Sequence, residues 1–225
     1  MPEGQYLAVD LETTGLDPSR NSIIEIGAIP LDEYLNRRPD VEPFHTYVQP
    51  WPDAEVAQQA LAVNKQFWVN KPESDEYKRA LPYRQAWEAF WSFLYKHYGD
   101  NPKFIVLVGW NVSFDEGFLK RMCVWSNVNE RVAIHDDALK KYKWPFHWHK
   151  IDLLGVCRYL DARKGRPPRK SYRLEALAEH YYSALAKFAA HTAMGDCELQ
   201  LKVLEAIEKE DDTLHQSVDP PTHDR

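Results

Sequence analysis

Residues 6–15 read Tyr-Leu-Ala-Val-Asp-Leu-Glu-Thr-Thr-Gly, an apolar run that ends in two carboxylates and a turn. The apolar part, residues 6–11, predicts a buried strand whose carboxyl end carries the polar groups. Asp10 and Glu12 are two residues apart, so on a strand both side chains point to the same face of the sheet. Paired anions repel each other, and hard divalent cations such as Mg²⁺ commonly neutralise them. A solvated strand end is the simpler alternative, and this pair alone leaves both open.

The rest of the chain predicts one α/β domain built around this strand. Apolar and β-branched runs predict further strands at residues 22–31, 44–48, 104–108 and 150–153. Apolar residues at helical spacing predict helices at residues 85–98, 115–126, 153–160, 173–185 and 192–208, and a short helix near 54–63 within a long connection over 50–83. The close spacing of the first three strands favours an antiparallel meander. The order of elements predicts a mixed five-stranded sheet flanked by helices.

Length and charge limit the class of protein. We expect a single domain over residues 1–208, followed at 209–225 by an acidic tail that is poor in apolar residues and is expected to be disordered. The formal charge of −6 excludes a generally basic protein that coats nucleic acid, but not an enzyme that concentrates its positive charge in one place. Three cysteines without a C-x-x-C pair, and no apolar run long enough for a membrane helix, favour a soluble cytoplasmic protein without membrane contact.

A second acidic motif, Gly-Trp-Asn-Val-Ser-Phe-Asp at residues 109–115, follows the predicted strand at 104–108. Asp115 falls at a strand-to-helix turn, where α/β enzymes place functional groups. An aspartate at a helix start also stabilises the helix without any chemistry. The motif by itself therefore supports either interpretation.

The third motif is His-Thr-Ala-Met-Gly-Asp at residues 191–196. On one continuous helix, His191 and Asp196 would be about 140° apart. They converge only if His191 lies in the loop before the last helix and Asp196 in the first turns of that helix. Histidine is the side chain that titrates nearest to pH 7, which suits a general base, although a lone histidine also serves purely structural roles.

The three motifs together resemble the DEDDh 3′-to-5′ exonuclease superfamily, which is DnaQ-like, includes proofreading exonucleases and ribonuclease T, and has a ribonuclease-H-like fold. The resemblance rests on residues 10–15, 111–115 and 191–196, with similar connecting segments at 23–28 and 174–178, and spans roughly residues 5–205. The sister class carries tyrosine at the position of Thr192, so the histidine class is favoured. Trp110 and Cys197 depart from the family pattern, which puts substrate preference rather than catalysis in question.

The resemblance implies a site and an activity. Asp10, Glu12, Asp115 and Asp196 would hold two Mg²⁺ or Mn²⁺ ions, and His191 would act as general base. The reaction would hydrolyse phosphodiester bonds at single-stranded DNA or RNA 3′ ends and release nucleoside 5′-monophosphates. The residues expected to contact the terminal nucleotides are Thr13, Thr14, Gly15, Leu16, Asn111 and Phe114. For two of them a structural role stays open: Leu16 could be a buried residue of a plain turn, and Phe114 could pack under the helix.

Residues 163–173 carry six positive charges in eleven residues and form the strongest basic run of the chain. We hypothesise that Arg166, Arg169 and Lys170 hold phosphates of the incoming strand, against the alternative of a merely solvated loop. Residues 144–149, Trp-Pro-Phe-His-Trp-His, suggest a stacking platform or a His-x-His metal site, but side-chain packing is the favoured interpretation.

Two other functions fit parts of the pattern. One is a catalytically silent module that binds nucleic acid or a protein partner on the same fold. The other is an endonuclease, which the spacing of His191 and Asp196 disfavours. The sequence leaves open the preference for DNA or RNA, and whether the protein works alone, as a homodimer or beside a polymerase.

Overall fold

A five-stranded sheet forms the centre of the molecule. The computed structural model describes residues 5–64, 67–99, 104–128, 134, 136–182 and 191–209. The strands are β1 (Gln5–Thr13), β2 (Ile23–Leu31), β3 (Phe44–Tyr47), β4 (Ile105–Gly109) and β5 (Phe146–Asp152), in the order β3-β2-β1-β4-β5. β1, β2 and β3 pair antiparallel, whereas β4 pairs parallel with β1 and β5 parallel with β4. The mixed five-stranded sheet and the antiparallel meander are therefore confirmed.

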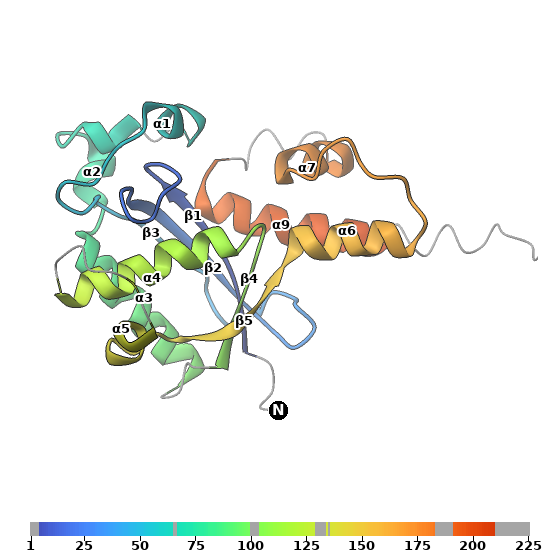
Figure 1. Ribbon diagram of the computed structural model, residues 1–225, viewed down its shortest axis with the longest axis horizontal. Coiled ribbons are helices and arrows are strands. Elements are labelled where there is room, and N and C mark those ends of the chain that lie inside the picture. The colour runs from blue at the N-terminus through green and yellow to red at the C-terminus, as the bar shows by residue number, and fades with distance from the viewer. Residues whose placement is uncertain are drawn as a thin grey trace, which may run out of the picture.

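Helices cover both faces of this sheet. The helical elements are α1 (Gln58–Asn64), the 3₁₀ turn η1 (Phe67–Asn70), α2 (Asp75–Arg79), α3 (Tyr83–Tyr98), α4 (Ser113–Val128), α5 (Asp136–Lys141), α6 (Leu153–Arg163), α7 (Leu174–Tyr182) and α9 (Ala193–Lys209). Figure 1 shows α3 and α4 on one side of the strands and α6 and α9 on the other. α7 packs on α9 rather than on the sheet. Among the described residues, no helix is long and apolar enough to cross a membrane.

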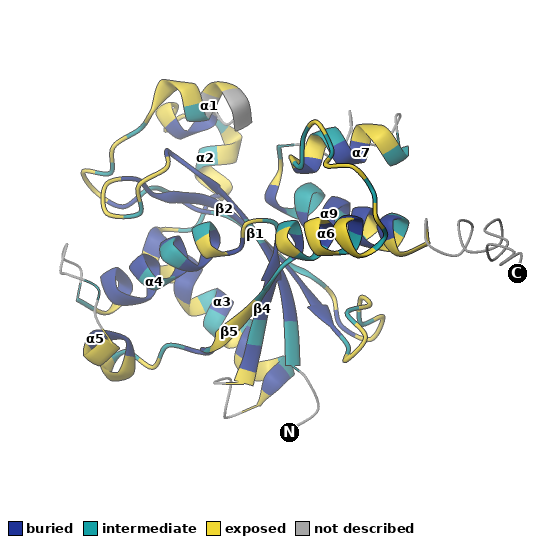
Figure 2. Ribbon diagram, turned by 45° about the vertical axis from the view of Figure 1, so that its right-hand side comes forward, coloured by how far each residue is buried: buried dark blue, intermediate teal, exposed yellow. Residues whose placement is uncertain are grey.

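The two faces of β1 enter two different cores. Leu7, Val9 and Leu11 pack with Phe90 of α3 and Phe118 of α4. The intervening Ala8 packs on the α9 side, with Cys197 and Leu204. Figure 2 shows the central strands largely buried, and every residue of β2 is buried. A polar side chain on β2 therefore lies inside the molecule and needs a specific partner.

The structure corrects the sequence analysis at the edge of the sheet. β5 begins at Phe146, four residues before the predicted strand at 150–153. The prediction missed this start because the middle of β5 is exposed and lacks the apolar pattern of a strand. Trp144 and Phe146 pack together with ring centroids 5.0 Å apart, and Phe146 lies in the core, as the packing interpretation expected. Trp148 is 74% exposed on the edge strand.

Other boundaries shift by a few residues. The connection at 50–83 contains η1 and α2 besides the predicted helix, and α2 is too short for helical periodicity, with Ser74 as its N-cap. The last predicted helices appear as α7 and α9. Residues 183–185 of the helix predicted at 173–185 lie outside the described residues. The same is true of residues 210–225, most of the predicted acidic tail.

The N-terminus of α9 lies directly against β2. A Cβ atom on Gly27 would stand 2.5 Å from the backbone C and O atoms of Ala193, far inside van der Waals contact. Glycine at this position therefore allows the first turn of α9 to approach the middle of the sheet.

Replacing Gly27 by alanine should push the first turn of α9 away from the sheet. We expect Gly27→Ala to lower the free energy of unfolding by about 1–3 kcal/mol, as overpacking does in other cores. Urea denaturation measures the effect. Gly155→Ala is the matched control, because a Cβ atom on Gly155 meets nothing within 4 Å. Equal stability of the two variants would contradict this account of Gly27.

Candidate active site

Three carboxylates meet where β1 passes beneath the start of α9. Asp10 and Glu12 point to the α9 face of the sheet, and Asp10 pairs with Gly27 of β2. Asp196 lies in the first turn of α9, which the missing side chain of Gly27 brings close. One oxygen atom from each of Asp10, Glu12 and Asp196 lies within 4.8 Å of the other two. Two motifs far apart in the sequence thus form one acidic cluster, which we call the carboxylate triad.

Asp115 reaches the same region from the opposite side of the sheet. Asp115 lies in the first turn of α4, which packs on the other face of the sheet, and the residue is only 4% exposed. Its carboxylate accepts hydrogen bonds from the backbone N–H groups of Leu11 and of Asp115 itself. It stands outside the close-packed triad, but its negative charge acts on Asp10 more strongly than that of any other acid.

Burial raises the pKa of every acid in this group, and the charges of neighbouring acids add to the effect. Burial, followed by the charges of Asp115, Asp196 and Glu12, holds the pKa of Asp10 well above its usual value. Burial and the charge of Asp196 raise the pKa of Glu12 to about 9. Burial raises the pKa of Asp196 to about 7, against the opposing hydrogen bond from the backbone of His191. Without a cation, the site is partly neutralised by protons.

The donor set fits a divalent cation. Asp196 Oδ2 accepts a hydrogen bond from the backbone N–H of His191 at 3.2 Å. Its other oxygen, Oδ1, is buried and has no hydrogen-bond partner among the residues that the structure describes. A buried carboxylate oxygen without a partner is costly unless a positive charge faces it. Oxygen ligands from several carboxylates are those that Mg²⁺ and Mn²⁺ prefer.

His191 occupies the position that convergence requires. It lies in the loop before α9, with a left-handed backbone at φ +73°, while Asp196 lies in the first turn of the helix. The hydrogen bond from its backbone N–H to Asp196 fixes this residue beside the carboxylate triad. The structure therefore satisfies the geometric condition that the spacing of the two residues imposed.

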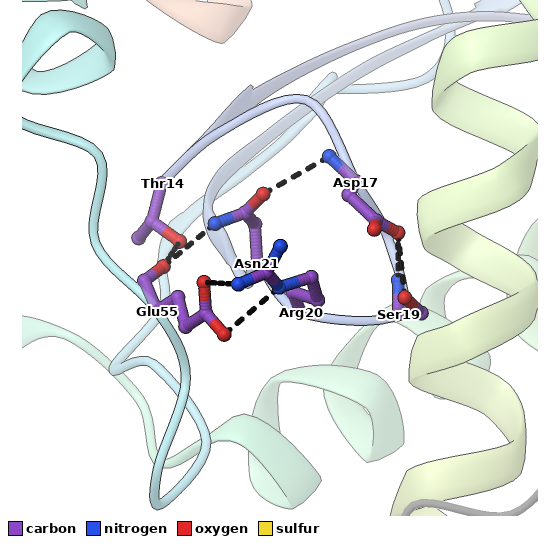
Figure 3. Close-up of polar contacts among 6 residues, drawn as sticks. All are labelled: Thr14, Asp17, Ser19, Arg20, Asn21 and Glu55. Carbon is purple, nitrogen blue, oxygen red and sulfur yellow. Dashed lines mark hydrogen bonds and ion pairs between the residues drawn. The ribbon is translucent and has the colours of Figure 1, made fainter.

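The turn after β1 is held by its own polar groups. The Thr14 hydroxyl donates to the backbone carbonyl of Glu55 at 2.7 Å, and Asn21 Nδ2 donates to the same carbonyl at 2.8 Å (Figure 3). A Cβ atom on Gly15 would stand 2.5 Å from the Asn21 side chain, so this position requires glycine. Leu16, by contrast, is 84% exposed beyond the turn.

Thr13 likewise uses its hydroxyl inside the turn, donating to the carbonyl of Gly15 at 2.7 Å. Thr13 and Thr14 are both buried. Of the four residues predicted here for substrate contact, only Leu16 presents an exposed side chain. Both threonine hydroxyls thus hold the turn, and the predicted contact of this turn with substrate stays a prediction.

The second motif forms a tight turn between β4 and α4. Asn111 has a left-handed backbone at φ +58°, and its N–H donates to Asp152 Oδ1 at 3.0 Å. Asp152 Oδ1 also accepts from the N–H of Leu154 and so caps α6. Phe114 is half-buried, with its ring 4.9 Å from that of Phe118. Asn111 is exposed near the acidic cluster, whereas Phe114 packs partly on the core.

The basic residues at 163–173 pack against an acid on α6 that sequence reasoning overlooked. Asp161 is 1% exposed and accepts hydrogen bonds from Arg166 at 3.1 Å, from Arg169 at 2.6 and 3.0 Å, and from the Tyr172 hydroxyl at 3.0 Å. Burial acts to raise the pKa of Asp161, but these hydrogen bonds outweigh it and hold the pKa below its usual value. Arg166 and Arg169 thus face Asp161, while Lys170 is exposed.

A second overlooked acid lies beside the triad. Glu25 pairs with Glu12 across β1 and β2, is completely buried, and has its Oε1 2.8 Å from Nε2 of His45. Its charge contributes to the raised pKa of Asp10, Glu12 and Asp196. A glutamate in the middle of an otherwise apolar strand was the signal that could have revealed it.

The two departures from the family pattern have structural partners. Trp110 Nε1 donates to the carbonyl of Tyr172 at 3.0 Å, and Cys197 Sγ lies 3.2 Å from the carbonyl of Gly27. Both contacts join separate elements beside the site. The structure thus gives both residues a packing role.

The raised pKa values predict how stability depends on pH. An acid with a higher pKa in the folded state binds its proton more tightly there, so the free energy of unfolding falls as pH rises between the two values. For Asp196 this window runs from 3.8 to about 7, and for Glu12 from 4.5 to about 9. In EDTA, we expect the free energy of unfolding to fall as the pH rises from about 5 to about 8.

Divalent cations should remove this decline, because bound cations replace the protons. Urea denaturation at several pH values, with EDTA or with Mg²⁺, measures both effects. Asp196→Asn should weaken the pH dependence in EDTA. Stability that rises with pH in EDTA would contradict the electrostatic description of the site.

Comparison with known proteins places this arrangement in a family. The family model described as Exonuclease (RNase T) matches residues 7–204. The PolC-type DNA polymerase III of Caldanaerobacter subterraneus subsp. tengcongensis is 26% identical over 210 residues, which cover 92% of this chain and 12% of the polymerase. That of Clostridium perfringens is 28% identical over 203 residues, covering 90% and 11%. The chain therefore corresponds to only a small part of these relatives.

Solved structures share the fold. Exonuclease I of E. coli in complex with a dT13 oligonucleotide matches with a TM-score of 0.68 and 18% identity, over 95% of this chain and 43% of that one. Exonuclease I of Methylocaldum szegediense matches with a TM-score of 0.66 and 18% identity, over 93% and 41%. The ribonuclease-H-like fold is thereby confirmed. The chain belongs to the RNase T exonuclease family, within the DnaQ-like DEDDh superfamily of 3′-to-5′ exonucleases.

Proposed function

We propose that this protein is a divalent-cation-dependent 3′-to-5′ exonuclease that acts on single-stranded ends and releases nucleoside 5′-monophosphates. The observation that carries the proposal is the carboxylate triad of Asp10, Glu12 and Asp196, whose oxygens meet within 4.8 Å. Asp115 and His191 of the same family motifs lie beside it. Folding alone does not favour such a gathering of acids, because burial and repulsion raise the pKa of each one.

The four acids would hold two cations, Mg²⁺ or Mn²⁺. When bound, such cations supply positive charge that stabilises the attacking and leaving oxygens of an in-line phosphoryl displacement. The chain itself contributes the fixed placement of the ligands. The first turns of α4 and α9 carry Asp115 and Asp196, where the helix dipole favours a negative charge.

His191 would accept the proton of the attacking water. The hydrogen bond from its N–H to Asp196 anchors the residue next to the carboxylates. The left-handed backbone at His191 is a strained conformation that surrounding contacts must maintain. Such strain at a polar residue beside an acidic cluster supports a functional role.

Single-stranded DNA is the first substrate to test. Solved structures of E. coli Exonuclease I with similar folds contain dT13 and dA16 oligonucleotides, and the relatives of known name are DNA polymerases. Leu16, exposed after β1, and Asn111, exposed after β4, are the side chains that we propose for contact with a terminal nucleotide. RNA ends remain the second substrate class, and association with a polymerase is supported by the PolC-type relatives.

The three cysteines are free thiols, which suits the reducing cytoplasm that we propose as the location of the protein.

Substitutions in the acidic cluster test catalysis directly. Asp10→Ala and Asp196→Ala should abolish hydrolysis of a 5′-labelled single strand in Mg²⁺, and His191→Ala should slow it by about 10²–10⁴-fold. A ladder that shortens from the 3′ end supports the proposal, and EDTA should stop it. Internal cuts would indicate an endonuclease, and no product from the wild type would indicate a silent binding module. Full turnover by His191→Ala at pH 7 would contradict its role as general base.

The basic residues at 163–173 have two different predicted roles, one in binding the strand and one in stability. Lys170 is exposed, so Lys170→Ala should weaken binding of all single strands and reduce the salt slope by about one, without changing stability. Arg169→Ala should instead lower the free energy of unfolding by about 1.5–3 kcal/mol, because it removes charged hydrogen bonds to buried Asp161. Fluorescence anisotropy at several salt concentrations and urea denaturation measure the two effects. An unchanged salt slope in Lys170→Ala would exclude it from phosphate binding.

A further inference from the structure

Gln200 is a completely buried polar residue that none of the family motifs contains. It lies on α9, four residues after Asp196 and therefore on the same side of the helix, facing the sheet. A buried side-chain amide without hydrogen bonds would destabilise the fold, so its partners show what it does there.

The amide of Gln200 joins two strands. Its Oε1 accepts a hydrogen bond from the backbone N–H of Trp110 at 2.8 Å, and its Nε2 donates to the backbone carbonyl of Val9 at 3.3 Å. Only one orientation of the amide satisfies both partners, since the reverse would place donor against donor and acceptor against acceptor. The two hydrogen bonds therefore fix both the side chain and the separation of the two backbone segments.

These contacts occur at the point where the two strands part. The parallel ladder between β1 and β4 ends at the pair Ala8–Val108. Val9 lies one residue and Trp110 two residues beyond this pair, and the Gln200 amide connects them past the last paired residues.

Each end of this connection is next to a proposed ligand. Val9 directly precedes Asp10, Trp110 opens the turn that leads to Asp115, and Gln200 itself follows Asp196 by one helical turn. One side chain thus links the three segments that carry the acids. A change at Gln200 alters the spacing of these segments without removing a carboxylate.

We propose that Gln200 is a positioning residue of the metal site, and that its two hydrogen bonds set the spacing of Asp10, Asp115 and Asp196 for cation binding. This inference rests on the proposed function, since it assigns Gln200 to the cation site of that activity. Hydrogen-bonding partners that orient metal ligands typically contribute about 10–100-fold to metal affinity.

The test replaces Gln200 by methionine, which has a similar size and shape but cannot form either hydrogen bond. Val203→Ala is the matched control: Val203 is buried on the same helix, but it packs toward α6 and α7 rather than the strands. Gln200→Asn is a milder variant for use if methionine prevents folding, because its shorter amide does not span both partners. Isothermal titration with Mn²⁺ measures cation affinity, and urea denaturation in EDTA measures stability for each protein.

We expect Gln200→Met and Gln200→Asn to bind Mn²⁺ at least about tenfold more weakly than the wild type, and Val203→Ala to bind as the wild type does despite its lower stability. In hydrolysis, the Gln200 variants should need a higher Mn²⁺ concentration than the wild type to reach half of their maximal rate, whereas Val203→Ala should need no more than the wild type. Wild-type affinity in both Gln200 variants would overturn the inference and leave the proposed function intact. A wild type that neither binds Mn²⁺ nor degrades single strands would overturn the proposed function, and the inference with it.

Discussion

The repulsion among buried carboxylates at the end of β1 is the constraint on which the surrounding structure depends. Each acid is placed by a separate device: the first turns of two helices carry Asp115 and Asp196, and the missing side chain of Gly27 lets α9 approach. Backbone N–H groups of Leu11 and His191 hold the carboxylates in place without neutralising them. The fold therefore maintains an arrangement of charge that only a cation, or protons, can compensate.

The sequence predicted the parts of this arrangement that depend on local geometry. The alternation of a strand put Asp10 and Glu12 on one face, and helical geometry required His191 to precede the last helix; both hold in the structure. Apolar runs also predicted the mixed sheet. The start of β5 was missed because an edge strand with exposed residues such as Trp148 has little apolar pattern to detect.

Individual side-chain contacts could not be predicted in the same way. Arg166 and Arg169 belong to a conspicuous basic run, but only the structure shows that Asp161 engages both of them. Similarly, the sequence does not show which groups the hydroxyls of Thr13 and Thr14 contact. In the folded chain they donate hydrogen bonds to the carbonyls of Gly15 and Glu55. A single polar residue such as Gln200 carries no periodic signal, so its burial becomes visible only in the folded structure.

The acids come to one place from helices on opposite faces of the sheet, α4 on one side and α9 on the other. The arrangement therefore depends on two cores at once, and loosening either layer moves one ligand relative to the rest. Local opening needs less free energy than global unfolding. On heating, loss of either layer should accordingly separate the acids, even where the other layer is still folded.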